Sequence, residues 1–107
     1  MMLSDNWYRQ GFSCGKKIQV SDFVFFKIWH DEAGKAVGAT VDFETANDYH
    51  YEMPISEWNK FLEKVLSVKD ADKATAAFQK YLATNKGLFD FESDLQMRGI
   101  GFQKIFF

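Results

Sequence analysis

Residues 18–30, IQVSDFVFFKIWH, with 36–43, AVGATVDF, and 49–53, YHYEM, decide the fold of this chain. β-Branched and aromatic residues dominate these stretches, which is typical of strands. The segment DEAGK separates the first two stretches, and Ala46 and Asn47 lie between the second and the third. Both connections have the composition of turns. The sequence therefore predicts a three-stranded antiparallel meander.

Strand side chains alternate between the two faces of a sheet, so the strand register can be tested against hydrophobicity. A pairing that sets Phe26 opposite Ala39 and Val41 opposite Tyr51 gathers the apolar residues on one face. The members of this predicted core face are Val24, Phe26, Ile28, Val37, Ala39, Val41, Phe43, Tyr49, Tyr51 and Met53. The opposite face is half aromatic and half acidic.

Helical periodicity replaces the strand pattern after Pro54. Apolar residues recur on one stripe between 55 and 66, and Ser56 is the expected N-cap of that helix. A second helix is predicted to begin at Asp70 or Asp72 and to end near 85–87. A third, over 89–98, turns its acidic residues outward and stops at Gly99. Residues 100–107 form a final strand.

The order of these elements predicts an α+β fold, a two-layer sandwich in which two or three helices cover the core face and the C-terminal strand joins the same sheet. We expect the last strand beside 18–30, reached by a right-handed crossover if the two run parallel. The length of 107 residues suits a single domain, 1–107. Within it, the N-terminal segment 1–16 is a candidate to lie over the sheet.

Composition excludes several classes of protein. Thirteen Lys and Arg against fifteen Asp and Glu give a net charge of −2, which argues against a nucleic-acid-binding surface. The longest apolar run, 23–26, is too short to span a bilayer. The first residues lack the charged and apolar regions of a secretory signal, so a cytoplasmic location is expected.

The aromatic half of the outer face needs a cover, because a bare apolar patch of this size is unusual on a monomer. Its predicted members are Phe23, Phe25, Trp29, Phe102 and Phe106, with Ile105 and Phe107 replacing the last two if the final strand is set the other way. Trp7, in the N-terminal segment, is predicted to lie against them and to complete an interface or pocket. Three alternatives could cover it: the N-terminal segment as a lid, a second subunit in a homodimer, or a small apolar ligand held between lid and sheet.

The acidic half gathers at the tip of the second hairpin. Its members are Asp42, Glu44, Asp48, His50 and Glu52. This surface is predicted to dock a basic protein partner; the plainer alternative is a solvated face with His50 paired to Asp42. Carboxylates with an imidazole also suit a metal ion, but their spacing fits no metal-binding loop. No metal or cofactor is therefore expected.

Cys14 is the single cysteine, and the neighbouring Lys16 and Lys17 would favour its thiolate. A Cys-dependent enzyme needs a general base near the thiol, and nothing in the sequence places His30 or His50 near Cys14. We therefore interpret Cys14 as a free thiol and assign no catalytic residue. The leading hypothesis is a small non-enzymatic interaction module, homodimeric, with the acidic hairpin as its docking surface. A small-molecule-binding domain comes second, and a metal- or Cys-dependent enzyme third.

Overall fold

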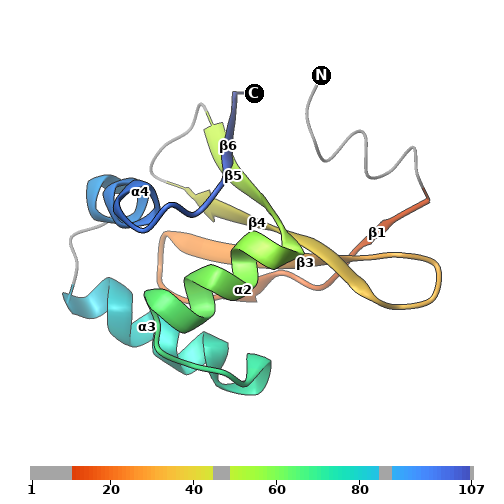
Figure 1. Ribbon diagram of the computed structural model, residues 1–107, viewed down its shortest axis with the longest axis horizontal. Helices are drawn as coiled ribbons and strands as arrows, with labels where there is room; N and C mark the ends of the chain where they lie inside the picture. The colour runs from red at the N-terminus through yellow and green to blue at the C-terminus, as the bar shows by residue number, and fades with distance from the viewer. Residues whose placement is uncertain (1–10, 45–48, 85–87, 107) are drawn as a thin grey trace.

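The computed structural model describes residues 11–44, 49–84 and 88–106. Within these ranges, six strands form one antiparallel sheet and three α-helices cover one side of it (Figure 1). The strands are β1 (Ser13–Cys14), β2 (Ile18–Gln19), β3 (Val24–His30), β4 (Ala36–Phe43), β5 (Tyr49–Pro54) and β6 (Gln103–Phe106). The helices are α2 (Ile55–Lys64), α3 (Ala74–Thr84), which follows the short 3-10 helix η1 (Ala71–Lys73), and α4 (Leu88–Met97). The predicted α+β sandwich, with its C-terminal strand in the same sheet, is confirmed.

The stretch predicted as one long strand over 18–30 is in fact two strands that fold back on each other. β2 pairs antiparallel with β3, with Ile18 opposite Phe26. The turn between them is closed by a hydrogen bond from the Val20 N–H to the Val24 carbonyl, 2.9 Å, and Phe23 N–H donates to Ser21 Oγ at 3.2 Å. Ser21, a turn-forming residue inside an apolar stretch, was the signal for this reversal.

β1 and β2 lie along the same edge of β3 and are separated by a break at Gly15. The Gly15 N–H donates to the Ile28 carbonyl at 2.8 Å. A Cβ at position 15 would stand 2.7 Å from that same oxygen, so the close approach of the two backbones requires glycine. Together β1 and β2 occupy the outer edge of β3.

The meander has the predicted faces with one change of register. Val41 lies opposite Tyr51, as predicted, but Phe26 pairs with Val41 and not with Ala39. A β-bulge where Trp29 and His30 pair with β4 breaks the regular ladder between these strands. The displacement is two residues, an even number, so every side chain stays on its predicted face.

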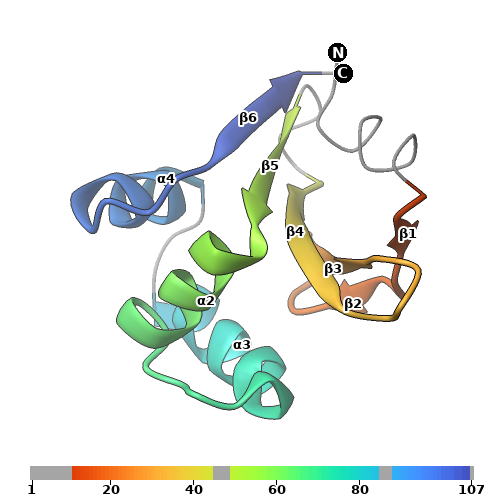
Figure 2. The same ribbon diagram turned by 45° about the vertical axis from the view of Figure 1, so that its right-hand side comes forward.

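The position of β6 differs from the prediction. β6 pairs antiparallel with β5, Tyr51 lying opposite Lys104, at the far end of the sheet from β1 and β2 (Figure 2). The place beside β3 that the sequence suggested is filled by β1 and β2. α4 ends as predicted at Gly99, whose φ is +65°, and the Ile100 N–H donates to the Leu95 carbonyl at 2.9 Å. This turn leads the chain from α4 directly to the free side of β5.

The N-cap residues of two helices were predicted, and the structure confirms one of the two. α2 begins at Ile55, so Pro54 and not Ser56 occupies the N-cap position. The φ of Pro54, −58°, is fixed by its ring and directs the chain into the helix without a side-chain cap. Ahead of α3, Asp70 is the residue that caps, because its Oδ1 accepts the Asp72 N–H at 2.9 Å.

The core lies between the sheet and the helices, two layers whose arrangement Figure 2 shows. Its buried residues are Val20, Val24, Phe26, Ala39, Val41, Phe43, Tyr51, Met53, Trp58, Phe61, Leu62, Ala74, Phe78, Tyr81, Phe91, Leu95 and Ile100. Ile28 and Tyr49 pack against this cluster, whereas Val37, beside the bulge, does not belong to it. No helix in the described ranges has the length and apolar character needed to cross a membrane.

Candidate functional site

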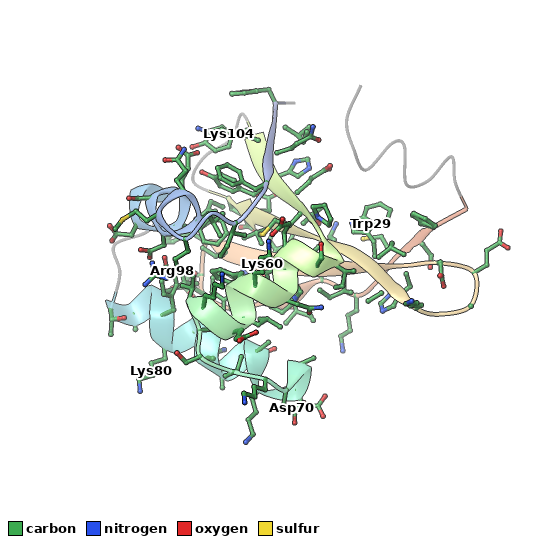
Figure 3. The ribbon with its side chains drawn as sticks, in the orientation of Figure 1. Trp29, Lys60, Asp70, Lys80, Arg98 and Lys104 are labelled. Atoms are coloured by element: carbon green, nitrogen blue, oxygen red, sulfur yellow. The ribbon has the colours of Figure 1, made fainter. Side chains whose placement is uncertain are left out.

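In the described ranges, the sheet face away from the helices holds three buried side chains. Trp29, His50 and Glu52 all lie on this face, and they are only 4%, 6% and 0% exposed. Trp29 does not belong to the main core and lies on the side of the strands away from α2 and α3 (Figure 3). The expectation of a solvated polar face is therefore wrong for His50 and Glu52.

The residues of the predicted acidic docking surface differ in their burial. His50 Nε2 lies 2.8 Å from Glu52 Oε1, and both side chains are buried, so the imidazole is paired along its own strand and not with Asp42. Glu44 remains exposed and forms an ion pair with Lys17 at 3.1 Å. Asp48 lies outside the described residues. Asp42 and Glu44 are thus the described members of the set that reach solvent.

The carboxyl group of Asp42 has a raised pKa. Partial burial raises its pKa above the ordinary value, Glu44 raises it further, and His50 and two lysines oppose the rise. A raised pKa means that the folded protein holds this proton more tightly than the unfolded chain does. Ionised Asp42 is therefore a cost to folding at neutral pH.

We expect Asp42→Asn to stabilise the domain at pH 7, because the amide removes that cost. The parent protein should lose stability relative to the variant as pH rises through the raised pKa, and the difference should vanish below the ordinary aspartate pKa of about 3.9. Urea unfolding at both ends of this range measures it, with the exposed Glu63→Gln as control. An Asp42→Asn protein less stable than its parent at pH 7 would contradict the assignment.

The structure does not assemble the predicted aromatic patch. Phe25 lies beside Lys17 and Lys27, whose Nζ atoms stand 4.1 and 5.6 Å from its ring centroid. Phe23, at the turn before β3, is 56% exposed. Phe102 and Phe106 lie at the other end of the sheet and on its helix side, in ring contact with Tyr51 and Tyr49, and Ile105 takes the outer face. Trp7 lies outside the described residues, so the lid stays a prediction.

The remaining chemistry-bearing residues form no reactive group. Cys14 is half-buried on β1, and burial raises the pKa of its thiol against the smaller opposing effect of Lys27. A raised pKa disfavours the thiolate that a nucleophile or ligand requires. No group of three or more His, Cys, Asp or Glu residues in the described part of the chain could hold a metal ion.

β6 forms one edge of the sheet. Within the described ranges no strand pairs with its second side. The N–H and C=O groups on the open side of an edge strand are what an added strand would pair with. Phe106, at the end of β6, is 64% exposed, and its ring lies tilted against that of Tyr49 of β5, with 5.5 Å between the ring centroids.

A cluster of polar contacts supports this edge from the helix side. Glu92 of α4 accepts a hydrogen bond from the Tyr51 hydroxyl at 3.0 Å, and Lys104 Nζ lies 3.0 Å from the same carboxylate oxygen. Lys104 Nζ also stands 4.3 Å from the Tyr49 ring centroid. The prediction that the acids of this helix face outward holds only in part for Glu92, which is half-buried because the hydroxyl of buried Tyr51 needs a hydrogen-bond partner. Burial and this hydrogen bond raise the pKa of Tyr51.

The opposite edge of the sheet is built differently. β1 and β2 are two residues long each, and the break at Gly15 interrupts them. The exposed Lys16 and Lys17 follow that break. Short strands and lysines are the usual means by which proteins protect a sheet edge. Of the two edges, β6 alone offers four consecutive strand residues and an exposed aromatic ring.

No family model, no curated protein and no solved structure matches this chain. Its function is therefore argued from the geometry above.

Proposed function

We propose that this chain is a small protein-interaction module that binds a partner by accepting an extended strand at the β6 edge. The observation that carries the proposal is the exposed Phe106 on a sheet edge that no described strand covers. Strand addition uses the edge backbone for affinity and the flanking side chains for specificity. Phe106 supplies an aromatic anchor of the kind that dominates interface energetics.

The acidic hairpin supports a docking role less well. Glu52 and His50 are buried against each other, and Glu44 is engaged by Lys17. A basic partner would have to compete with that lysine for Glu44. Asp42 with Glu44 is therefore too small a charged surface to carry the function alone, and the β6 edge replaces it as the proposed contact.

Photo-cross-linking tests the proposed function without knowledge of the partner. Benzoylphenylalanine placed at position 106, in cells that express the chain, should trap a protein at the β6 edge. The matched control carries the same probe at Phe23, which is also exposed but lies at the β2–β3 turn. Cross-links that form at 106 and not at 23 are the expected result. Equal trapping at both positions, or none at 106, would refute the proposal.

A small-molecule-binding domain remains a second candidate, favoured by the burial of Trp29 on the face that also holds His50 and Glu52. Polar groups beside an aromatic ring under cover are typical of ligand sites. Tryptophan fluorescence of the parent and of Trp29→Phe, titrated with a library of small apolar compounds, tests this idea. A response that survives Trp29→Phe unchanged would exclude this face as the site.

A further inference from the structure

We propose that the strand added at the β6 edge is β6 of a second copy of this chain, paired antiparallel about a two-fold axis at Ile105. The inference rests on the proposed function and names the partner of that same edge. Two-fold contacts are the commonest in homo-oligomers, because one patch need only complement itself.

Symmetry leaves few ways to pair β6 with its copy. Residues that face each other across an antiparallel pair lie on the same side of the sheet. Along β6, Lys104 and Phe106 lie on the helix side, and Gln103 and Ile105 lie on the other. The two-fold axis can pass through Lys104 or through Ile105. At either position, three residues of β6 lie opposite residues of β6 in the second copy.

Charge distinguishes the two positions of the axis. An axis at Lys104 sets two ammonium groups directly opposite each other, which is destabilising. An axis at Ile105 sets Lys104 of each copy opposite Phe106 of the other, so a cation meets an aromatic ring twice. Ile105, half-buried in the single chain, then faces itself on the outer side.

The neighbouring contacts show that Lys104 is suited to this arrangement. Its ammonium group is held over the Tyr49 ring and beside Glu92, which keeps it on the helix side of the sheet. Phe106 lies on the same side, where its ring contacts Tyr49, and the residue is 64% exposed. A second copy would bring a Lys104 beside each Phe106 ring, which supports a copy over an unrelated strand.

The contact is small, because four residues of each strand make it. Interfaces of this size are at the weak end of specific association. We therefore expect a reversible dimer with a dissociation constant of about 10 µM to 1 mM.

Disulfide trapping tests both the partner and the register. In a Cys14→Ser background, Ile105→Cys places two thiols opposite each other within the 4.4–6.8 Å Cα range, roughly, that a disulfide spans. Lys104→Cys places them on a diagonal of about 7–8 Å, which is too long. With oxidised glutathione, Ile105→Cys should form covalent dimers much faster than Lys104→Cys and faster than Gln96→Cys on α4. Faster trapping through position 104, or equal rates at all three, would overturn the proposal.

Charge substitution gives an independent measurement by sedimentation equilibrium. Phe106→Lys sets two like charges opposite each other in each pair and should weaken association about tenfold or more. Phe106→Glu, which loses the same ring, should keep the dimer through pairing with Lys104 of the second copy. If both variants weaken association equally, the Ile105 register is wrong.

The two proposals fail in different ways. A parent protein that stays monomeric at about 1 mM, and does not trap through position 105, overturns the second copy as partner. Trapping of a different protein at position 106 would then leave the proposed function standing. Absence of any cross-link at 106 removes the proposed function itself.

Discussion

Replacing Phe78 with alanine should lower the free energy of unfolding by about 3–5 kcal/mol. Phe78 is fully buried on α3, where its ring contacts Phe26 of β3, Phe61 of α2 and Phe91 of α4. Truncation removes the apolar contacts that join the sheet to all three helices and leaves a cavity that they cannot close together.

The loss is large compared with the total stability of a domain of this size, about 5–15 kcal/mol. Urea unfolding measures it as a lower midpoint at constant slope. Phe23→Ala is the matched control, because it makes the same chemical change at a residue that is 56% exposed, and it should alter stability by less than about 1 kcal/mol. Similar losses in the two variants would mean that Phe78 does not hold the layers together.

Breaking the buried His50–Glu52 pair should be nearly as costly. His50→Leu removes the imidazole that lies 2.8 Å from the fully buried Glu52 side chain, and breaking a buried pair from one side costs about 3–5 kcal/mol. Changing both residues to leucine should recover much of this loss, because neither polar side chain of the pair then remains buried.

The exposed pair between Lys17 and Glu44 is the matched control. Its atoms are 3.1 Å apart, but the side chains are 49% and 41% exposed, so Lys17→Leu should cost at most about 1 kcal/mol. A double-mutant cycle on each pair, by urea unfolding at pH 7, gives the two coupling energies. Equal coupling in the two pairs would show that burial does not strengthen the His50–Glu52 contact.

Sequence reasoning succeeded where local pattern determines structure. The alternation around Val41 and Tyr51 identified the core face, because burial of that face is a property of the strands themselves. Gly99 identified the end of α4, because its left-handed backbone is a local requirement. The same reasoning gave the fold class and the helices.

Sequence reasoning failed where the structure depends on contacts between segments far apart in the chain. Whether β6 joins β3 or β5 depends on β1 and β2 occupying the outer edge of β3, which no pattern within 100–107 records. The burial of His50 and Glu52 depends on what lies over that face, so their alternation with Tyr51 resembled that of a solvated strand. Trp29 shares this face with His50 and Glu52, and a large apolar side chain on an otherwise polar face was the sequence signal that the face is covered.

The two borders of the sheet also limit how these molecules can aggregate. A fibre grown edge to edge needs two receptive borders on each molecule, one to be joined and one to pass the contact on. Here the border at β1 and β2 is interrupted by Gly15, whose backbone lies so close to Ile28 that the interruption cannot be smoothed into a continuous strand. The proposed association through β6 would therefore end with a closed pair, because the border at β1 and β2 offers a further molecule no continuous strand in the described residues.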